Sequence, residues 1–346
     1  MDEANVAKLR EVIKGIPRVR LANLPTPLEE LHNLTRTLKG PRVLIKRDDL
    51  TGLAFGGNKN RSMEFYFGDA LSRGATVVVA GAGTQSNYCR QVAAAASKLG
   101  LKAVLVLRGN PKIQGNLLLD YLLGAEVKII PVRDIEDVAD EVDRVAEELR
   151  RKGETPYVIK GYRGYEPLAA LAYLECSLEL LDQLNALGTH ADYIFTSATG
   201  PTQAGFLLGT KLLKLNWNIV GIAPIRWKYE AMSAKIARLG NECAEFLKLE
   251  ARVNPTEVIN LDQFVGEDYG ILTQEAVEAI KLLARTEGVL LDPVYTSKGM
   301  AGLLHQIRCE LIGKGATVVF LHTGGTPALF AYSDELGLEC SKENPL

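Results

Sequence analysis

Short runs of apolar residues, many of them β-branched, alternate with longer amphipathic runs along most of the chain. This alternation is typical of parallel strands joined by helices, because both faces of a parallel strand are buried whereas a helix buries only one. In the first half of the chain the pattern predicts strands at 43–46, 76–80, 103–107 and 127–131. It predicts helices at 89–99, 115–123 and 135–152, each followed directly by a glycine.

The second half continues the pattern with a long helix from about residue 170 to 187 and strands at 193–197, 219–223 and 317–321. A chain of 346 residues is longer than one compact core usually spans, so we expect two lobes. The elements between 76 and 152 would form a small βα lobe.

Composition agrees with a soluble enzyme. A formal net charge of -2 gives no basic face for nucleic acid. Five cysteines without a C-x-x-C pair favour free thiols in a reducing compartment, and four scattered histidines offer little basis for a metal site. Neither a signal peptide nor an apolar run of roughly 18 residues is found, so we expect a cytoplasmic protein without a membrane partner.

Lys59 is the first candidate for chemistry, because it follows two glycines directly after the strand at 43–46. A lysine in this setting is usually an ordinary turn residue. A nucleotide-binding loop is excluded, since the glycine spacing is wrong and Asn60 stands where that motif has Ser or Thr. At the end of a strand, however, the amine could be attached to a carbonyl cofactor.

Four further polar segments follow predicted strands or buried apolar runs, where open α/β sheets bind their ligands. They are residues 83–88, 197–205, 291–296 and 321–325. Together with Lys59 they form a candidate site.

In order and spacing, this set resembles the pyridoxal-phosphate enzymes of the tryptophan synthase β-like fold, and within them the D-cysteine desulfhydrase and 1-aminocyclopropane-1-carboxylate deaminase branch. The branch motifs are Gly56-Gly57-Asn58-Lys59, Gln85-Ser86-Asn87 and Asp292-Pro293-Val294-Tyr295. The resemblance extends from about residue 18 to residue 332, which is nearly the whole chain.

The resemblance implies fold type II, an α/β architecture of two lobes, each with a mostly parallel twisted sheet flanked by helices. Residues 1–61 and 173–346 would form the large cofactor-binding domain, and residues 62–172 a small domain inserted into it. It also implies a homodimer that acts on a small amino acid with pyridoxal 5'-phosphate as cofactor.

For the cofactor, the resemblance implies that Lys59 forms a Schiff base with the aldehyde and later takes the Cα proton of the substrate. Asn58 and Asn87 would also contact the cofactor. The loop expected to bind the phosphate, at the start of a helix near residue 203, consists of Thr199, Gly200, Pro201 and Thr202. Relatives commonly have Ser or Gly at 201, and many carry a lysine where this chain has Ser62.

For the substrate, the resemblance implies that Ser86 and Asn87 contact its carboxylate, with Gln85 and Tyr88 beside them. Capping of the following helix would equally explain Ser86. Tyr88 replaces the histidine common in cysteine desulfhydrases, which weakens the assignment of the substrate.

Tyr269 and Tyr295 match two tyrosines that line the site in the family. They would stack, or transfer a proton to the leaving group, although both could equally be core aromatics. The deaminase branch tends to carry glutamate where this chain has Thr296. Thr296, with Thr323, would keep the pyridine nitrogen protonated only poorly, and this favours elimination over the opening of a cyclopropane ring.

The leading hypothesis is therefore β-elimination from D-cysteine, which gives pyruvate, sulfide and ammonia. The alternatives are deamination of 1-aminocyclopropane-1-carboxylate, a lyase acting on L-cysteate or another β-substituted alanine, and β-replacement. A non-catalytic pyridoxal-phosphate-binding protein is a further alternative, but it would be expected to lack Lys59 or the pair Ser86 and Asn87, and both are present.

Overall fold

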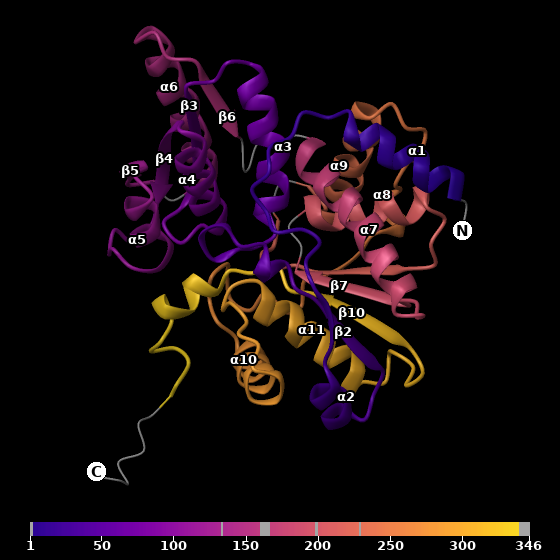
Figure 1. Ribbon diagram of the computed structural model, residues 1–346. Helices are drawn as coiled ribbons and strands as arrows, with labels where there is room; N and C mark the ends of the chain where they lie inside the picture. Colours follow the sequence, from indigo (N-terminus) through magenta and orange to yellow (C-terminus); the bar gives the residue numbers. More distant parts are fainter. Residues whose placement is uncertain (1–2, 133, 160–166, 198–199, 228–229, 339–346) are drawn as a thin grey trace.

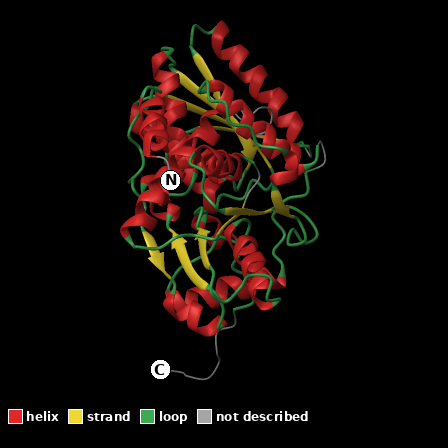
Figure 2. Cartoon of the chain, turned by 90° about the vertical axis from the view of Figure 1, so that its right-hand side faces the viewer, coloured by secondary structure: helices red, strands yellow, loops and turns green. Residues whose placement is uncertain are grey.

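The structure is a computed structural model that describes residues 3–132, 134–159, 167–197, 200–227 and 230–338. The chain forms two sheets with helices around each of them (Figure 1). A quarter turn of the molecule shows the two groups of strands one above the other, with helices flanking both (Figure 2). Within the described residues, no helix combines the length and the apolar character needed to cross a lipid bilayer.

The smaller sheet has four parallel strands in the order β5-β4-β3-β6. Its elements are β3 (Val77–Gly83), α4 (Asn87–Leu99), β4 (Lys102–Arg108), α5 (Gly115–Leu122), β5 (Glu126–Ile130), α6 (Ile135–Arg151) and β6 (Pro156–Ile159). Alternate residues of β3 face opposite sides of the sheet. Val78 packs into the main core that includes α4, whereas Val79 packs against Val138 and Val142 of α6.

The larger sheet has six strands in the order β1-β2-β10-β7-β8-β9, all parallel except β1. Its strands are β1 (Leu28–Glu30), β2 (Arg42–Lys46), β7 (Tyr193–Ser197), β8 (Asn218–Ile222), β9 (Ile259–Leu261) and β10 (Thr317–Leu321). The remaining helices are α1 (Glu3–Lys14), α2 (His32–Leu38), α3 (Lys59–Ser72), α7 (Pro167–Ala186), α8 (Pro201–Leu212), α9 (Met232–Phe246), α10 (Gln274–Glu287) and α11 (Thr296–Arg308).

The apolar strands of this sheet are buried on both faces, as their continuous hydrophobic runs predict. On β10, Val319 packs into the core shared with α7, α8 and α9, and Phe320 packs into the second core with α10 and α11. Because β2, β10, β7 and β8 are neighbours and run parallel, their carboxyl ends lie at one edge of the sheet, and the loops that follow them lie close together.

Every predicted strand and helix corresponds to an observed element, with ends that differ by a few residues. The strands β1, β6 and β9, of three or four residues, were not predicted because so short a run carries little periodicity. The predicted domain limits at 61/62 and 172/173 fall inside α3 and α7. Helix α7 packs along α8, α3 and α9.

Candidate active site

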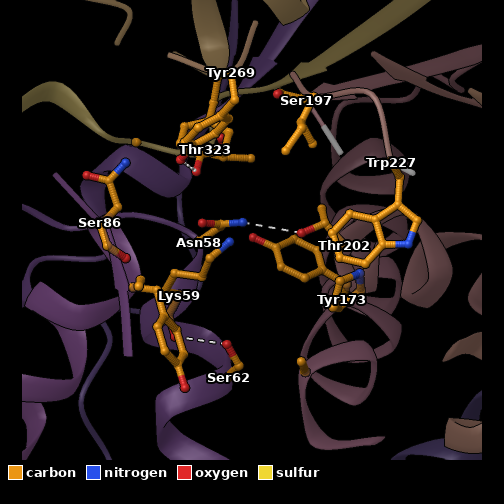
Figure 3. Close-up of a pocket in the computed structure, with 18 of the residues that line it drawn as sticks. Asn58, Lys59, Ser62, Ser86, Tyr173, Ser197, Thr202, Trp227, Tyr269 and Thr323 are labelled. Atoms are coloured by element: carbon orange, nitrogen blue, oxygen red, sulfur yellow. Dashed lines mark hydrogen bonds between the residues drawn. The ribbon is translucent and has the colours of Figure 1, made fainter. Parts of the chain in front are cut away.

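A cavity of about 160 Å³ lies between the two lobes, at the carboxyl ends of strands from both sheets (Figure 3). The predicted site residues that line it are Asn58, Lys59, Ser86, Asn87, Tyr88, Pro201, Thr202, Tyr269, Tyr295 and Thr323. Gln85, Gly200 and Thr296 do not line it, and Thr199 lies outside the described residues. The structure thus brings together most of a set that is scattered over more than two hundred residues of sequence.

Lys59 is placed by a loop whose backbone only glycine can adopt. Gly56 and Gly57 have positive φ angles of 65° and 117°. A Cβ on Gly56 would lie 2.0 Å from the carbonyl oxygen of Asp49. The loop between β2 and α3 can therefore turn tightly at these glycines. Helix α3 begins at Lys59, and the side chain of Lys59 points into the cavity.

The Lys59 amine is held in a partly neutral state. Burial lowers the pKa of Lys59 to about 8, although the nearby carboxylate of Asp292 partly opposes this shift. Among the described residues no hydrogen bond or ion pair to this amine is found. An amine of this kind can react with a carbonyl carbon or accept a proton near neutral pH.

A buried ionic network lies behind the cavity, on the opposite side of the first turn of α3. Arg61 is fully buried and donates from Nε and Nη2 to the two oxygens of Asp48, at 2.8 Å each. It also donates to Glu179, at 2.8 Å from Nη1. Burial works against the charge of Arg61, but Asp48 and Glu179 raise its pKa well above the usual range.

Glu179 also pairs with the buried amine of Lys46. Burial alone would raise the pKa of Glu179, but Arg61 and Lys46 lower it to about 2. The hydroxyl of Tyr173, a residue that borders the cavity, donates to Asp48 at 2.6 Å. The network therefore fixes α3 to β2 and α7 beneath the reactive lysine.

The start of α8 forms the end of the cavity that suits an anion. The first N–H groups of a helix have no partner within it, and its dipole favours negative charge. Thr202 places its hydroxyl there and accepts a hydrogen bond from the Asn58 amide at 3.2 Å. Ser197 Oγ is buried at the cavity wall, and no partner for it occurs among the residues that the structure describes.

Pro201 is the first residue of α8, where the missing N–H of proline breaks no intrahelical hydrogen bond. The departure from Ser or Gly at this position therefore fits the helix geometry. An aldehyde with a phosphate group thus finds a reactive amine at Lys59, the first N–H groups of α8 and a Ser197 hydroxyl that has no partner among the described residues, so the residues present fit pyridoxal phosphate.

Ser86 and Asn87 begin α4 on the opposite wall. Ser86 Oγ accepts a hydrogen bond from the backbone N–H of Cys89 at 3.2 Å, so the predicted capping is present. Asn87 Oδ1 accepts from Arg90 and from Asn116, at 2.9 Å each, and these bonds fix its amide at the cavity.

Gln85 is turned away from the cavity. Its side chain donates to the carbonyl of Gln114 and accepts from the N–H of Asn116, both at 3.0 Å. These bonds tie the start of α5 to the turn between β3 and α4. They hold the Gln85 side chain away from the cavity, contrary to the prediction that it lies beside the substrate. The ring of Tyr88 lines the cavity, while its hydroxyl donates to the carbonyl of Ile159 at 2.7 Å.

Tyr269 and Tyr295 meet at the cavity wall. Their hydroxyl groups are hydrogen-bonded to each other, and their rings pack edge to face with centroids 6.0 Å apart. Such a pair can pass a proton between two oxygens at the cavity surface, and a hydroxyl in this position could act as an acid toward a leaving group.

Thr296 is fully buried and lies behind the cavity wall. Its hydroxyl donates to Asp292 Oδ1 and accepts from the N–H of Asp292, at 2.7 Å each. Asp292 also accepts from the N–H groups of Val294 and Tyr295 at 2.9 Å. The segment from Asp292 to Thr296 is therefore a hydrogen-bonded start of α11, and its threonine hydroxyl is committed to Asp292.

The motifs did not predict several cavity residues. They are Tyr66, Ala82, Arg108, Ala169, Tyr173, Ile225, Trp227 and Lys235, whereas Ser197 and Gly324 lie within the predicted polar segments 197–205 and 321–325. Three of the described lining residues are cations, namely Lys59, Arg108 and Lys235, and none is a carboxylate. The position of Trp227 in the segment that follows β8 is the one signal that could have indicated it. Within the described residues, no group of three His, Cys, Asp or Glu is arranged to hold a metal ion.

The family described as pyridoxal-phosphate dependent enzyme matches residues 19–324. A Pyrococcus horikoshii protein named provisionally as a 1-aminocyclopropane-1-carboxylate deaminase is 38% identical to this chain, covering 95% of it and 98% of the relative. A Klebsiella pneumoniae protein named D-cysteine desulfhydrase is 37% identical, covering 92% of this chain and 97% of the relative.

A crystal structure described as that of an ACC deaminase homologue superimposes with a TM-score of 0.88 at 38% identity, over 95% of this chain and 98% of that one. The predicted α/β architecture with mainly parallel sheets flanked by helices is thereby confirmed. The Escherichia coli diaminopropionate ammonia lyase shares the fold, with a TM-score of 0.65 at 18% identity, over 96% of this chain and 90% of that one.

Proposed function

The chain belongs to the family of pyridoxal-phosphate dependent enzymes, and we propose that it is a lyase that eliminates the β-substituent of D-cysteine. Its membership in the group that contains relatives named D-cysteine desulfhydrase and 1-aminocyclopropane-1-carboxylate deaminase is established, as are pyridoxal phosphate as its cofactor and its character as an enzyme. Between those two activities, the composition of the cavity wall favours the first.

The observation that carries the proposal is the absence of a carboxylate among the described residues of the cavity wall, beside a lysine and a pair of tyrosines. The cofactor, when bound, withdraws electrons from Cα and so acidifies its proton, most strongly when a carboxylate keeps the ring nitrogen protonated. At Thr296 this chain has a hydroxyl that is already bonded to Asp292. Elimination can proceed with this weaker sink, because the leaving group takes up the electron pair as the proton departs, whereas the opening of a cyclopropane ring has no such leaving group.

Each step of the elimination can be assigned to a side chain. The helix start at Ser86 and Asn87 would bind the substrate carboxylate, since its N–H groups and amide face the cavity. Lys59 would accept the Cα proton, because an amine with a pKa of about 8 is partly neutral at pH 7. The hydroxyls of Tyr269 and Tyr295 would supply a proton to the departing sulfur.

The atoms balance without a further reactant except water. The Cα–H and Cβ–S bonds break, a C=C bond forms, and hydrogen sulfide leaves. The released unsaturated amine takes up one water molecule and gives pyruvate and ammonia. No oxidant or reductant is required.

The test is to load the protein with pyridoxal phosphate and incubate it separately with D-cysteine, L-cysteine, L-cysteate and 1-aminocyclopropane-1-carboxylate. The oxo acid is then identified by mass spectrometry, with Lys59→Ala as the matched control. We expect pyruvate from D-cysteine at the highest rate and none from the variant. Formation of 2-oxobutanoate from the cyclopropane would instead make the protein a deaminase, and pyruvate with sulfite from L-cysteate would move the substrate to a sulfonate.

We also expect a homodimer, as the resemblance implies, and an exposed apolar surface supports it. Leu122 and Phe330 are 73% and 74% exposed, and they lie on α5 and on the 3-10 helix η4 (Thr326–Ala331), which contact each other. Contiguous exposed apolar side chains often mark interfaces. Leu122→Asp combined with Phe330→Asp should give a monomer in analytical ultracentrifugation, whereas an unchanged sedimentation coefficient would place the interface elsewhere.

A further inference from the structure

The cavity contains a second lysine, Lys235, that the proposed reaction does not use. It lies in the first turns of α9, and only 2% of its surface is exposed. Its Nζ atom lies 3.3 Å from the centroid of the Trp227 ring, a distance at which the ring attracts a cation. Burial lowers the pKa of Lys235 to about 8, with Glu230 opposing the shift, so a negative group beside this amine would restore its charge.

The amine lies at the end of the cavity where α8 begins. Figure 3 shows Trp227 on the same side of the cavity as Thr202 and opposite Ser86. Helices α8 and α9 pack together, so closely that a Cβ on Gly240 would lie 3.5 Å from the carbonyl oxygen of Ala204. Because its amine lies over the Trp227 ring, Lys235 faces the end of the cavity where α8 begins.

That end of the cavity has donors for an anion but needs a positive charge. A phosphate ester carries close to two negative charges at neutral pH. The start of α8 offers N–H groups, and Thr202 and Ser197 offer hydroxyls, yet none of these is a cation. Ser62, one turn after Lys59, donates its hydroxyl to the Lys59 carbonyl at 3.0 Å and carries no charge.

The two other cations of the cavity wall have different positions. Lys59 must bond to the aldehyde end of the cofactor. Arg108 ends β4, directly beside β3 and the turn that leads to Ser86, on the opposite wall. We propose that Lys235 binds the phosphate of pyridoxal phosphate and supplies from α9 the positive charge that Ser62 does not provide. The inference depends on the cofactor and not on the substrate, so it stands even if elimination from D-cysteine does not.

The test compares the affinity of the cofactor-free protein for pyridoxal phosphate and for pyridoxal, which lacks the phosphate. Absorbance titrations would measure both in the wild type and in Lys235→Met, which keeps the apolar stem against Trp227. Because a charge-assisted contact is lost, the affinity for pyridoxal phosphate should fall about 10- to 100-fold while that for pyridoxal stays unchanged. Lys211→Met, which removes the same charge at the far end of α8, is the control and should change neither affinity.

A rescue makes the test independent of folding. Adding Ser62→Lys to Lys235→Met should restore the affinity for pyridoxal phosphate, since Ser62 lines the same cavity and a lysine there supplies an amine from α3. Lys235→Arg should retain most of the affinity because it keeps the charge. Equal losses for both ligands, or an undiminished affinity of Lys235→Met for pyridoxal phosphate, would show that Lys235 does not bind the phosphate.

Discussion

Lys59 and Arg61 stand two residues apart in the first turn of α3, yet they have opposite electrostatic surroundings. Residues two apart point to nearly opposite sides of a helix. Lys59 faces a cavity whose described wall has no carboxylate, and its pKa falls to about 8. Arg61 faces Asp48 and Glu179, and its pKa rises well above the usual range.

Burial disfavours the charge of both groups, and the partners decide the outcome. On one side of α3 the partners hold a permanent charge that fixes the helix. On the other side, charged partners are nearly absent, so the Lys59 amine can lose its proton and react. The same turn of α3 therefore carries two different groups. Arg61 and its carboxylate partners Asp48 and Glu179, here called the anchor, fix the helix, whereas Lys59 is the reactive group. A substitution in the anchor can therefore leave the Lys59 amine in place.

The largest effect is expected when the reactive side is removed. Lys59→Ala should lower the rate of pyruvate formation by roughly 10³-fold or more, because a general base alone commonly contributes 10² to 10⁴ and this lysine also attaches the cofactor. Turnover is measured with D-cysteine by coupled pyruvate detection. Arg61→Lys, which keeps a charge in the anchor, is the comparison and should retain most of the activity. Equal losses of turnover in the two variants would contradict the view that Lys59 has a catalytic role and Arg61 a structural one.

On the anchor side the main effect should be on stability. Asp48→Asn removes one of the two carboxylates that pair with Arg61 and leaves it Glu179, so it should lower the free energy of unfolding by about 3 kcal/mol, the lower end of the cost of breaking a buried ion pair. Lys59→Met, which removes an amine without a close partner, should leave the free energy of unfolding unchanged or raise it. Urea unfolding of both cofactor-free variants measures the contrast, and similar losses in the two would refute it.

The sequence predicted many of the residues that gather at the cavity but did not predict the ion pairs of Arg61 on the other side of α3. Lys59, Ser86, Thr202 and Tyr295 could be grouped because loops at the carboxyl ends of parallel strands must meet. The ion pairs of Arg61 could not be predicted, because Asp48 and Glu179 join it only through the packing of β2, α3 and α7.

Side-chain direction was equally hidden from the sequence. Gln85 and Thr296 stand inside the right motifs, but their hydrogen bonds to α5 and to Asp292 turn them away from the cavity. Lys235 reaches the cavity from α9 through a region with no motif, so only the fold shows it. The strands and helices for which the sequence predicted a range, which depend on local periodicity, were by contrast placed within a few residues.

The tyrosine pair sharpens the comparison, because here the proposed proton donor is a hydroxyl that is hydrogen-bonded to a second hydroxyl. Tyr295→Phe should lower the turnover of D-cysteine by about 10²-fold, since the departing sulfur then lacks its acid. With β-chloro-D-alanine, whose chloride leaves without a proton, the same variant should be nearly as fast as the wild type. A loss of equal size with both substrates would mean that Tyr295 supports the cavity wall and does not supply the proton.

The smallest effect concerns the pH at which Lys59 becomes reactive. Only the neutral amine attacks the cofactor aldehyde, and neutral amine forms as the pH rises through the pKa. Because burial has lowered that pKa to about 8, the rate of covalent cofactor attachment should rise about tenfold from pH 6 to pH 7 and level off above pH 8. An unperturbed lysine would keep gaining rate up to about pH 10.4. Stopped-flow absorbance of the cofactor-free protein follows the attachment, and a profile that climbs steadily past pH 9 would show that the cavity does not hold Lys59 in its partly neutral state.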